Sequence, residues 1–345
     1  MTRAGGKLLL IGWDGADWKI IHKLVDEGKM PYLKAFIEDG VIGNLATLYP
    51  TLSPMLWTSI ATGKRPHKHG ILGFTEPEPN GGGIRPVSSL SRKTRALWNM
   101  ATLRGLRSIV VGWWPSHPVE PIHGVMVSNH FQRANQPYGK PWPVRKGCVH
   151  PERIVEALAS LRVHPQELPA ELMSLFIPRM AELDQEQNHR LESVARITAD
   201  CATVAKVSSV LLTHEPWDLA AIYFDSIDHY CHGFMNFHPP RLPWIGEKIF
   251  EMNCGVVEAG YRYHDALLGS LLKSAGEGVT TLIISDHGFH SDHLRLRYLP
   301  KEPAGPARQH RHYGILAARG PGIKRDQRIY GASLLDICPT VLSVL

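Results

Sequence analysis

Residues 7–15 read KLLLIGWDG, a short apolar run that ends in a glycine-flanked aspartate, Asp14. An apolar run of this length is typical of a strand that is buried on both faces of a parallel sheet. The Gly-Trp-Asp-Gly end predicts a loop after the strand. In open α/β sheets, ligands bind outside the carboxyl ends of the strands. Asp14 is therefore the first candidate for a functional residue.

Six further apolar runs are rich in β-branched residues, and helical stretches separate several of them. They are residues 41–48, 107–113, 124–128, 219–224, 279–285 and 314–318. Helical patterns cover residues 18–39, with a Gly28/Pro31 break, and residues 57–62. Strands that alternate with helices indicate the α/β class with a mainly parallel sheet.

Residues 129–210 differ in character from the rest. A polar, proline-rich loop leads into helical segments at residues 151–161, 171–177 and 185–212. We interpret residues 129–210 as a helical cap inserted into one domain that spans residues 1–345; two ordinary crossover helices with long loops are the alternative. The glycine-rich loop 76–85 is expected to be flexible and exposed. The apolar, helix-like segment 333–345 lacks a stop signal, so we expect the chain to continue past Leu345.

Composition excludes several classes of protein. The 345 residues are 43% hydrophobic and 20% charged, which excludes general disorder. No apolar run approaches the roughly 18 residues of a membrane span. The net charge of +6 suits an anionic ligand, but basic residues do not cluster with aromatic ones, so nucleic acid is not an expected partner. Five scattered cysteines and a start without a leader sequence predict a cytoplasmic location.

Polar side chains recur where the apolar runs end. Besides Asp14 they are Asp228 and His232 after the 219–224 run, Asp286 and His287 after the 279–285 run, His310 and His312 before the 314–318 run, and Ser53 near the start of a helix. Three aspartates and three histidines suit two divalent cations with oxygen and nitrogen ligands. Cation pairs about 3.5–4 Å apart are a recurring device for in-line displacement at phosphorus.

Five segments carry a resemblance to a known family. They are IGWDG (11–15), PTLSPMLWTSIATGKRPHKHGI (50–71), DSIDHYCHGF (225–234), SDHGF (285–289) and HRHYGILAARGPGI (310–323). In this order they resemble the alkaline phosphatase superfamily and, within it, the type I phosphodiesterase/nucleotide pyrophosphatase branch. The resemblance implies a three-layer α/β/α sandwich and a metal-dependent hydrolase.

The resemblance also implies roles for individual residues. Asp14, Asp286 and His287 correspond to the ligands of one metal ion, with Ser53 as nucleophile and fourth ligand. Asp228, His232 and His310 correspond to the ligands of the other, and His310 is favoured over His312. The donor set permits zinc or manganese, and the resemblance favours zinc.

At two positions the sequence differs from the patterns of related enzymes, and these differences narrow the range of expected activities. Leu56 occupies the position where many nucleotide pyrophosphatases have a phosphate-binding asparagine, so this contact is not expected. Ser53 is followed by Pro54 with no matching arginine, which argues against a sulfatase. We expect hydrolysis of a small phosphate ester, with a phosphodiester favoured, through a phosphoseryl intermediate. A phosphomonoesterase, phosphonate hydrolase or phosphomutase of the same superfamily, and a non-catalytic domain that binds a phosphorylated ligand, are the alternatives. The oligomeric state is left open.

Overall fold

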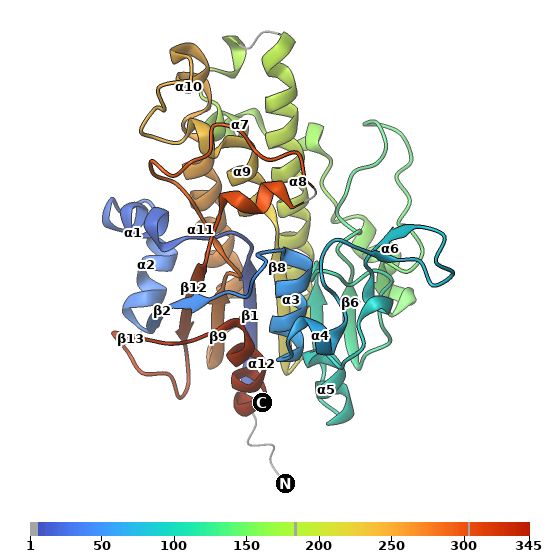
Figure 1. Ribbon diagram of the computed structural model, residues 1–345. Helices are drawn as coiled ribbons and strands as arrows, with labels where there is room; N and C mark the ends of the chain where they lie inside the picture. The colour runs from blue at the N-terminus through green and yellow to red at the C-terminus, as the bar shows by residue number, and fades with distance from the viewer. Residues whose placement is uncertain (1–5, 183–184, 303) are drawn as a thin grey trace.

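The computed structural model of the chain describes residues 6–182, 185–302 and 304–345 (Figure 1). Its main sheet has the strand order β13-β2-β12-β9-β1-β8-β5-β6-β7. The strands are β1 (Lys7–Trp13), β2 (Val41–Ala46), β5 (Ser108–Val111), β6 (Gly124–Val127), β7 (Val149–His150), β8 (Leu219–Phe224), β9 (Val279–Ile284), β12 (Tyr313–Arg319) and β13 (Gln327–Ile329). Each of the seven predicted strands is present.

The first apolar run forms the centre of the sheet. Strand β1 pairs in parallel with β8 on one side and with β9 on the other. Strands β5 and β6 continue the parallel arrangement beyond β8. Strand β12 is antiparallel to both β9 and β2, and β7 is antiparallel to β6. The sheet is therefore mixed but mainly parallel, as predicted.

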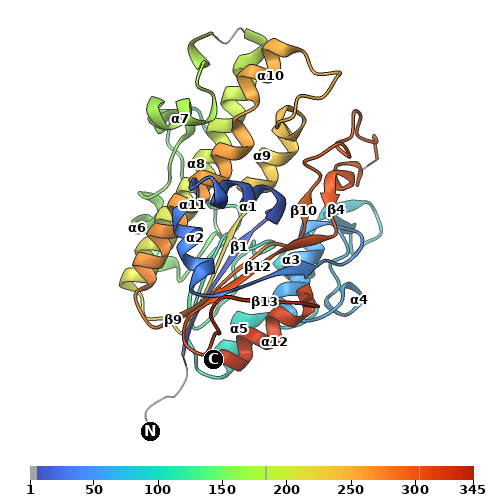
Figure 2. The ribbon, with the colours of Figure 1, turned by 90° about the vertical axis from the view of Figure 1, so that its left-hand side faces the viewer.

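Helices cover both faces of this sheet, as Figure 2 shows. Alternate residues of β1 enter two different cores: Leu9 and Ile11 belong to one, and Leu8 and Leu10 to the other. The first core includes residues of α1 (Trp18–Asp26), α2 (Pro31–Glu38), α8 (Gln185–His214), α9 (Ser226–Phe234) and α11 (Val256–Ala275). The second includes residues of α3 (Ser53–Thr62), α5 (Leu97–Leu103) and α12 (Leu334–Val344). This is the expected three-layer α/β/α sandwich.

The segment 129–210 contributes to more than one part of the fold. Helix α8 packs against β5 and β8 as a crossover helix does, and against α11. Helices α6 (Val155–Ala159) and α7 (Ala170–Phe176) precede it, and α7 contacts α11. At its upper end α8 rises beyond the sheet beside α7 and α10 (Glu247–Asn253) (Figure 1). The division into a domain and an inserted cap stays a prediction.

Two smaller pieces differ from the expectations. The loop 76–85 forms an exposed hairpin of β3 (Thr75–Pro77) and β4 (Ile84–Pro86). The 57–62 helix begins earlier, at Ser53. The short helix α4 (Pro66–His69) follows it. Within the described residues, no helix combines the length and the apolar character that a membrane crossing requires.

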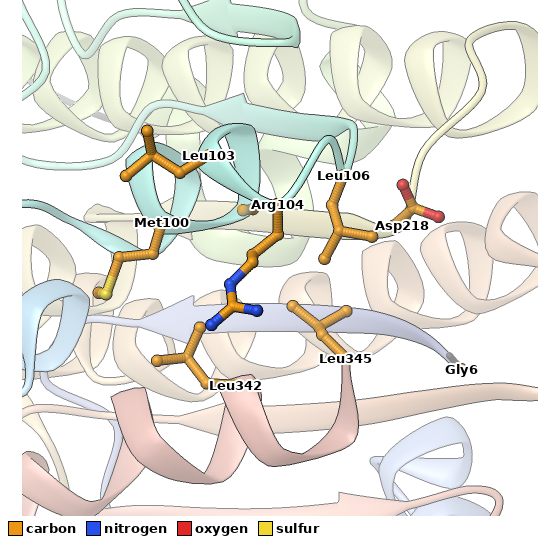
Figure 3. Close-up of a pocket in the computed structure, with 9 residues that line it drawn as sticks. Gly6, Met100, Leu103, Arg104, Leu106, Asp218, Leu342 and Leu345 are labelled. Atoms are coloured by element: carbon orange, nitrogen blue, oxygen red, sulfur yellow. The ribbon is translucent and has the colours of Figure 1, made fainter. Parts of the chain in front are cut away.

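A cavity of about 680 Å³ lies at the amino ends of the central strands (Figure 3). Its wall includes Gly6 before β1 and Asp218 before β8, together with Arg104 and Leu345. Because ligands of α/β sheets bind at the opposite, carboxyl edge, this cavity is separate from the site described below.

Candidate active site

The carboxyl ends of β8, β1 and β9 bring three predicted aspartates together. Asp14 follows β1, Asp228 lies in the first turn of α9 after β8, and Asp286 follows β9. These strands are parallel neighbours, so their carboxyl ends meet at one edge of the sheet. All three aspartates are buried.

Ser53 is the first residue of α3, and its side chain reaches Asp14. The hydroxyl donates to Asp14 Oδ1 over 3.4 Å. Trp57 lies one turn further along α3, on the same face as Ser53, and its Nε1 donates to Asp14 Oδ2 at 2.9 Å. Gly12 makes room for this indole, because a Cβ there would come within 2.6 Å of the Trp57 ring.

Tyr223 completes the environment of Asp14, since its hydroxyl donates to Asp14 Oδ2 at 2.6 Å. The sequence analysis did not identify Tyr223 or Trp57 as site residues. The helical spacing from Ser53 was a usable signal for Trp57. Tyr223 lies inside an apolar strand and offered no comparable signal.

His287 joins Asp14 and Asp286 in the first of two clusters. Its Nε2 lies 3.3 Å from Asp14 Oδ1 and 3.5 Å from Asp286 Oδ2. The backbone N–H of Gly15 donates to the other oxygen of Asp286. His287 is fully buried. The three predicted ligands of one metal ion therefore lie beside the hydroxyl of Ser53.

The second cluster contains Asp228, His232 and His310. Nε2 of His232 lies 3.3 Å from Asp228 Oδ1, and Nε2 of His310 lies 3.6 Å from the same oxygen. A short antiparallel ladder between β10 (Gly288–Phe289) and β11 (His310–Arg311) places His310. His312 is exposed, and its ring faces Tyr49 with 6.3 Å between centroids. The geometry thus brings His310 rather than His312 into the cluster.

In all three histidines, Nδ1 faces away from the cluster and Nε2 faces into it. Nδ1 of His310 donates to the Thr51 carbonyl oxygen at 3.0 Å, and Nδ1 of His232 donates to Gln309 Oε1 at 2.7 Å. Nδ1 of His287 donates to the Gly288 carbonyl oxygen at 3.2 Å. These oxygens only accept, so each Nδ1 carries a proton and Nε2 is the ring nitrogen that faces the cluster. Metal-binding histidines show this arrangement, in which the outer nitrogen is held by an acceptor.

The inner donor atoms fit divalent cations. Asp228 Oδ1, Asp286 Oδ2 and His287 Nε2 are buried, and none has a hydrogen-bond partner within the described part of the chain. Unpartnered buried polar atoms are costly unless something binds them. The ligand atoms of Asp228, His232 and His310 lie within 4.8 Å of one another, as do those of Asp14, Asp228 and His287. Asp228 thus adjoins both groups.

In the metal-free protein, the buried carboxylates and imidazoles of the two clusters shift one another's pKa values. Burial and the neighbouring Asp14 carboxylate raise the pKa of Asp286 well above its usual value. Burial lowers the pKa of His287, but the carboxylates of Asp286 and Asp14 outweigh it and raise that pKa to about 10. Burial and the charge on His287 lower the pKa of His310. A cation that binds the carboxylates removes the need for a proton on His287.

Two titratable residues near the site make their contacts elsewhere. His229 is 44% exposed and lies 3.9 Å from Asp225. Asp292 forms an ion pair with Lys19 at 2.7 Å. His229 and Asp292 therefore lie outside the two clusters.

Comparison with known proteins identifies the family. Residues 8–298 match the sequence profile described as type I phosphodiesterase/nucleotide pyrophosphatase. The chain belongs to this family. It is therefore a hydrolase that acts on phosphoester bonds. No curated protein sequence matches the chain.

Solved structures of the superfamily share the fold of this phosphodiesterase-family chain. Murine ectonucleotide pyrophosphatase/phosphodiesterase 5 is 12% identical, with a TM-score of 0.54, over 98% of this chain and 94% of the murine one. The human form gives 13% and 0.55 over the same shares. A substituted form of the alkaline phosphatase PafA gives 13% and 0.59, over 100% of this chain and 96% of that one. At these identities the likeness shows the fold alone.

Proposed function

We propose that this family member hydrolyses phosphodiesters at a site with two divalent cations, with Ser53 as the nucleophile. The observation that carries the proposal is the 3.4 Å contact between the Ser53 hydroxyl and Asp14, next to three buried donor atoms that lack partners within the described residues. A nucleophile beside an inward-facing set of carboxylates and imidazoles suits metal-assisted attack.

In this proposal each cluster holds one cation. Asp14, Asp286, His287 and the Ser53 oxygen would hold one, and Asp228, His232 and His310 would hold the other. Zinc is the cation we propose, although oxygen and nitrogen donors also accept manganese. When bound, the cations lower the pKa of the Ser53 hydroxyl and neutralise charge on the phosphate.

Ser53 carries the covalent chemistry. Its Oγ loses its proton to solvent and attacks phosphorus, and the bond from phosphorus to the leaving alcohol breaks as the Oγ–P bond forms. The departing oxygen takes a proton from water. A water molecule then attacks the phosphoserine, which releases a phosphomonoester and restores the hydroxyl. The amino end of α3, where Ser53 lies, favours the phosphate anion throughout.

Charge at the site favours a diester over a monoester. Two divalent cations carry about four positive charges, which three aspartates and a serine alkoxide balance. Nη1 of Arg311 donates to both carboxylate oxygens of Asp17, at 2.7 and 2.6 Å. Lys64 and Arg65 lie beyond the far end of α3, about 15 Å along the helix from Ser53. A monoanionic phosphodiester suits such a neutral site.

A direct comparison of substrates tests the proposal. With the zinc-loaded enzyme, kcat/KM for bis(4-nitrophenyl) phosphate should exceed that for 4-nitrophenyl phosphate by at least about tenfold. Faster monoester hydrolysis would instead favour a phosphomonoesterase. Binding of both compounds without turnover would identify a non-catalytic domain.

A further inference from the structure

Two adjoining chambers open beside the second cluster. The inner chamber, of about 440 Å³, is lined by His232 and also by Arg133, Arg196, Asp200 and His229. The outer chamber, of about 240 Å³, is lined by His130, Arg133, Asn135, Trp142, Arg145 and Arg162. Because Arg133 lines both, the chambers adjoin at its side chain, and the inner one borders the site at His232.

The outer chamber is strongly basic. Arginines 133, 145 and 162 line it, and no carboxylate is among its lining residues. The guanidinium of Arg145 makes no hydrogen bond and no ion pair with any described residue. The nearest acidic atom to Arg133 is Asp225 Oδ2, at 3.9 Å. Among the described residues this long contact is the one ion pair that the three guanidinium groups make, so the group is suited to bind a carboxylate or a phosphate.

Arg162 lines the outer chamber, and contacts with Trp142 hold its guanidinium in place. Its guanidinium lies 3.9 Å from the centroid of the Trp142 ring, and it donates to the Trp142 carbonyl oxygen. The stacked pair is held in place before any ligand arrives, so Arg162 adds positive charge at little further entropic cost. Arg133 and Arg145 remain available for direct contact.

The inner chamber differs in charge from the outer one. Asp200 lines it, and Asp200 Oδ1 is buried without a hydrogen-bond partner among the residues described. A carboxylate repels an anion but accepts hydrogen bonds from hydroxyl groups. The inner chamber combines this acceptor with Arg133 and Arg196 and suits a polar part of a ligand that carries hydroxyl groups, whereas the outer chamber, with three arginines and no acidic lining residue, suits an anionic part.

The position of the two chambers indicates which part of the substrate they face. In-line displacement places the nucleophile and the leaving oxygen on opposite sides of phosphorus. Ser53 lies beside the first cluster, at Asp14, whereas His232 belongs to the second cluster and lines the inner chamber. The leaving alcohol therefore departs toward the chambers.

We propose that the preferred substrates are phosphodiesters whose leaving alcohol carries a second anionic group, bound in the outer chamber by Arg133 and Arg145. This inference rests on the proposed function. The inner chamber holds the body of the alcohol, and the two arginines hold its carboxylate or phosphate. Selectivity thus comes from charge at a distance from the reacting phosphorus.

Three matched substrates test the proposal. They are methyl aryl phosphates whose phenyl ring carries a 4-carbamoylmethyl, 4-carboxymethyl or 4-phosphonomethyl group, so that the leaving phenols are similar and only the remote charge changes. With the zinc-loaded wild type, kcat/KM for at least one anionic substrate should exceed that for the neutral one by about tenfold or more. A larger preference for the phosphonate identifies a phosphate as the natural group, and one for the carboxylate identifies a carboxylate.

Variants connect the preference to the outer chamber. Arg145→Gln and Arg133→Gln should each reduce the ratio of anionic to neutral kcat/KM to about threefold or less. Arg325→Gln serves as a matched control, because Arg325 is 78% exposed and pairs with Asp39 elsewhere on the surface. This control should keep the wild-type ratio. If one chamber variant fails to fold, the other still gives the answer.

The outcomes separate the two proposals. Equal kcat/KM for all three substrates with the wild type overturns the anionic subsite and leaves the phosphodiesterase proposal intact. A preference that persists in both arginine variants overturns the assignment to Arg133 and Arg145. Absence of turnover with every substrate, the neutral one included, contradicts the proposed function itself.

Discussion

The Nε2 atoms of His232 and His310 lie 3.1 Å apart and face the same carboxylate oxygen of Asp228. Both Nδ1 atoms already donate to other oxygens. Two imidazole lone pairs at this separation repel each other unless a proton or a cation lies between them. A cation bound to Asp228 Oδ1 at this position would remove the repulsion.

Removal of metal should abolish activity. Exhaustive chelation should stop hydrolysis of bis(4-nitrophenyl) phosphate, and added zinc or manganese should restore it. Zinc should also raise Tm, because the cation binds the folded chain alone. His232→Ala should weaken both effects, whereas His214→Ala, at the exposed last residue of α8, should keep them. Activity and Tm that are indifferent to chelation would contradict the two-cation proposal.

Replacement of Ser53 should separate metal binding from chemistry. Ser53→Ala removes the nucleophile but none of the six carboxylate and imidazole ligands. We expect kcat for an aryl diester to fall by at least about 10³-fold, with the metal content measured by atomic emission unchanged. Ser270→Ala, at an exposed position on α11, is the control and should retain full activity. A Ser53→Ala enzyme with near wild-type kcat would refute the assignment.

The fold was largely predictable because its central strands are buried on both faces. Such strands read as unbroken apolar runs, as in Leu8–Ile11, and the structure contains each one predicted. Besides the hairpin strands β3 and β4, the strands that were missed are β7, β10, β11 and β13, which have two or three residues each. So few residues carry no periodicity. Their pairing depends on neighbours far away in the sequence.

The site was predictable only in its strand-end residues. Asp14 and Asp286 stand directly after apolar runs, whereas Tyr223 reads as part of such a run and meets Asp14 across 209 positions of sequence. Gln309 and Thr51 act through an amide oxygen and a backbone carbonyl, which no residue pattern reveals. The metal ligand roles and the cytoplasmic location remain predictions.

Tyr223→Phe should weaken the metal site without removing a ligand. The lost hydroxyl is one of two donors to Asp14 Oδ2, and Trp57 remains as the other. Loss of such an outer contact costs about 10–100-fold in metal affinity or activity. Titration with zinc, followed by activity, measures the change. Restoration of the wild-type rate at high zinc would show a positioning role, and an unchanged zinc affinity would exclude one.

The metal-free protein should lose stability as pH rises. The pKa of His287 is raised from 6.5 to about 10 in the folded state, so the folded chain holds a proton that the unfolded chain releases. The stabilisation from this group is complete below pH 6.5 and is lost as the pH approaches about 10.

Thermal unfolding after chelation measures this pH dependence. Tm should decline between pH 6.5 and 9.5, and zinc should reduce the decline because the cation replaces the proton. His287→Gln should flatten the profile of the chelated protein. His229→Gln, at an exposed histidine, should leave it as in the wild type. A profile for the chelated wild type that rises over this range would contradict the charge balance described for the first cluster.

Gly15→Ala should damage the site through the backbone. Gly15 has φ of +74°, and a Cβ there would lie 2.8 Å from the Phe289 ring and 3.1 Å from Asp228 Cα. Gly28 has nearly the same φ, +71°, but its Cβ would meet nothing within 4 Å. Gly28→Ala should therefore cost only the roughly 1–2 kcal/mol of a left-handed alanine. Gly15→Ala should cost more and also weaken zinc binding, because Asp228 must move. Equal losses of stability in the two variants, with zinc affinity unchanged, would show that the close approach of Gly15 to Asp228 does not shape the metal site.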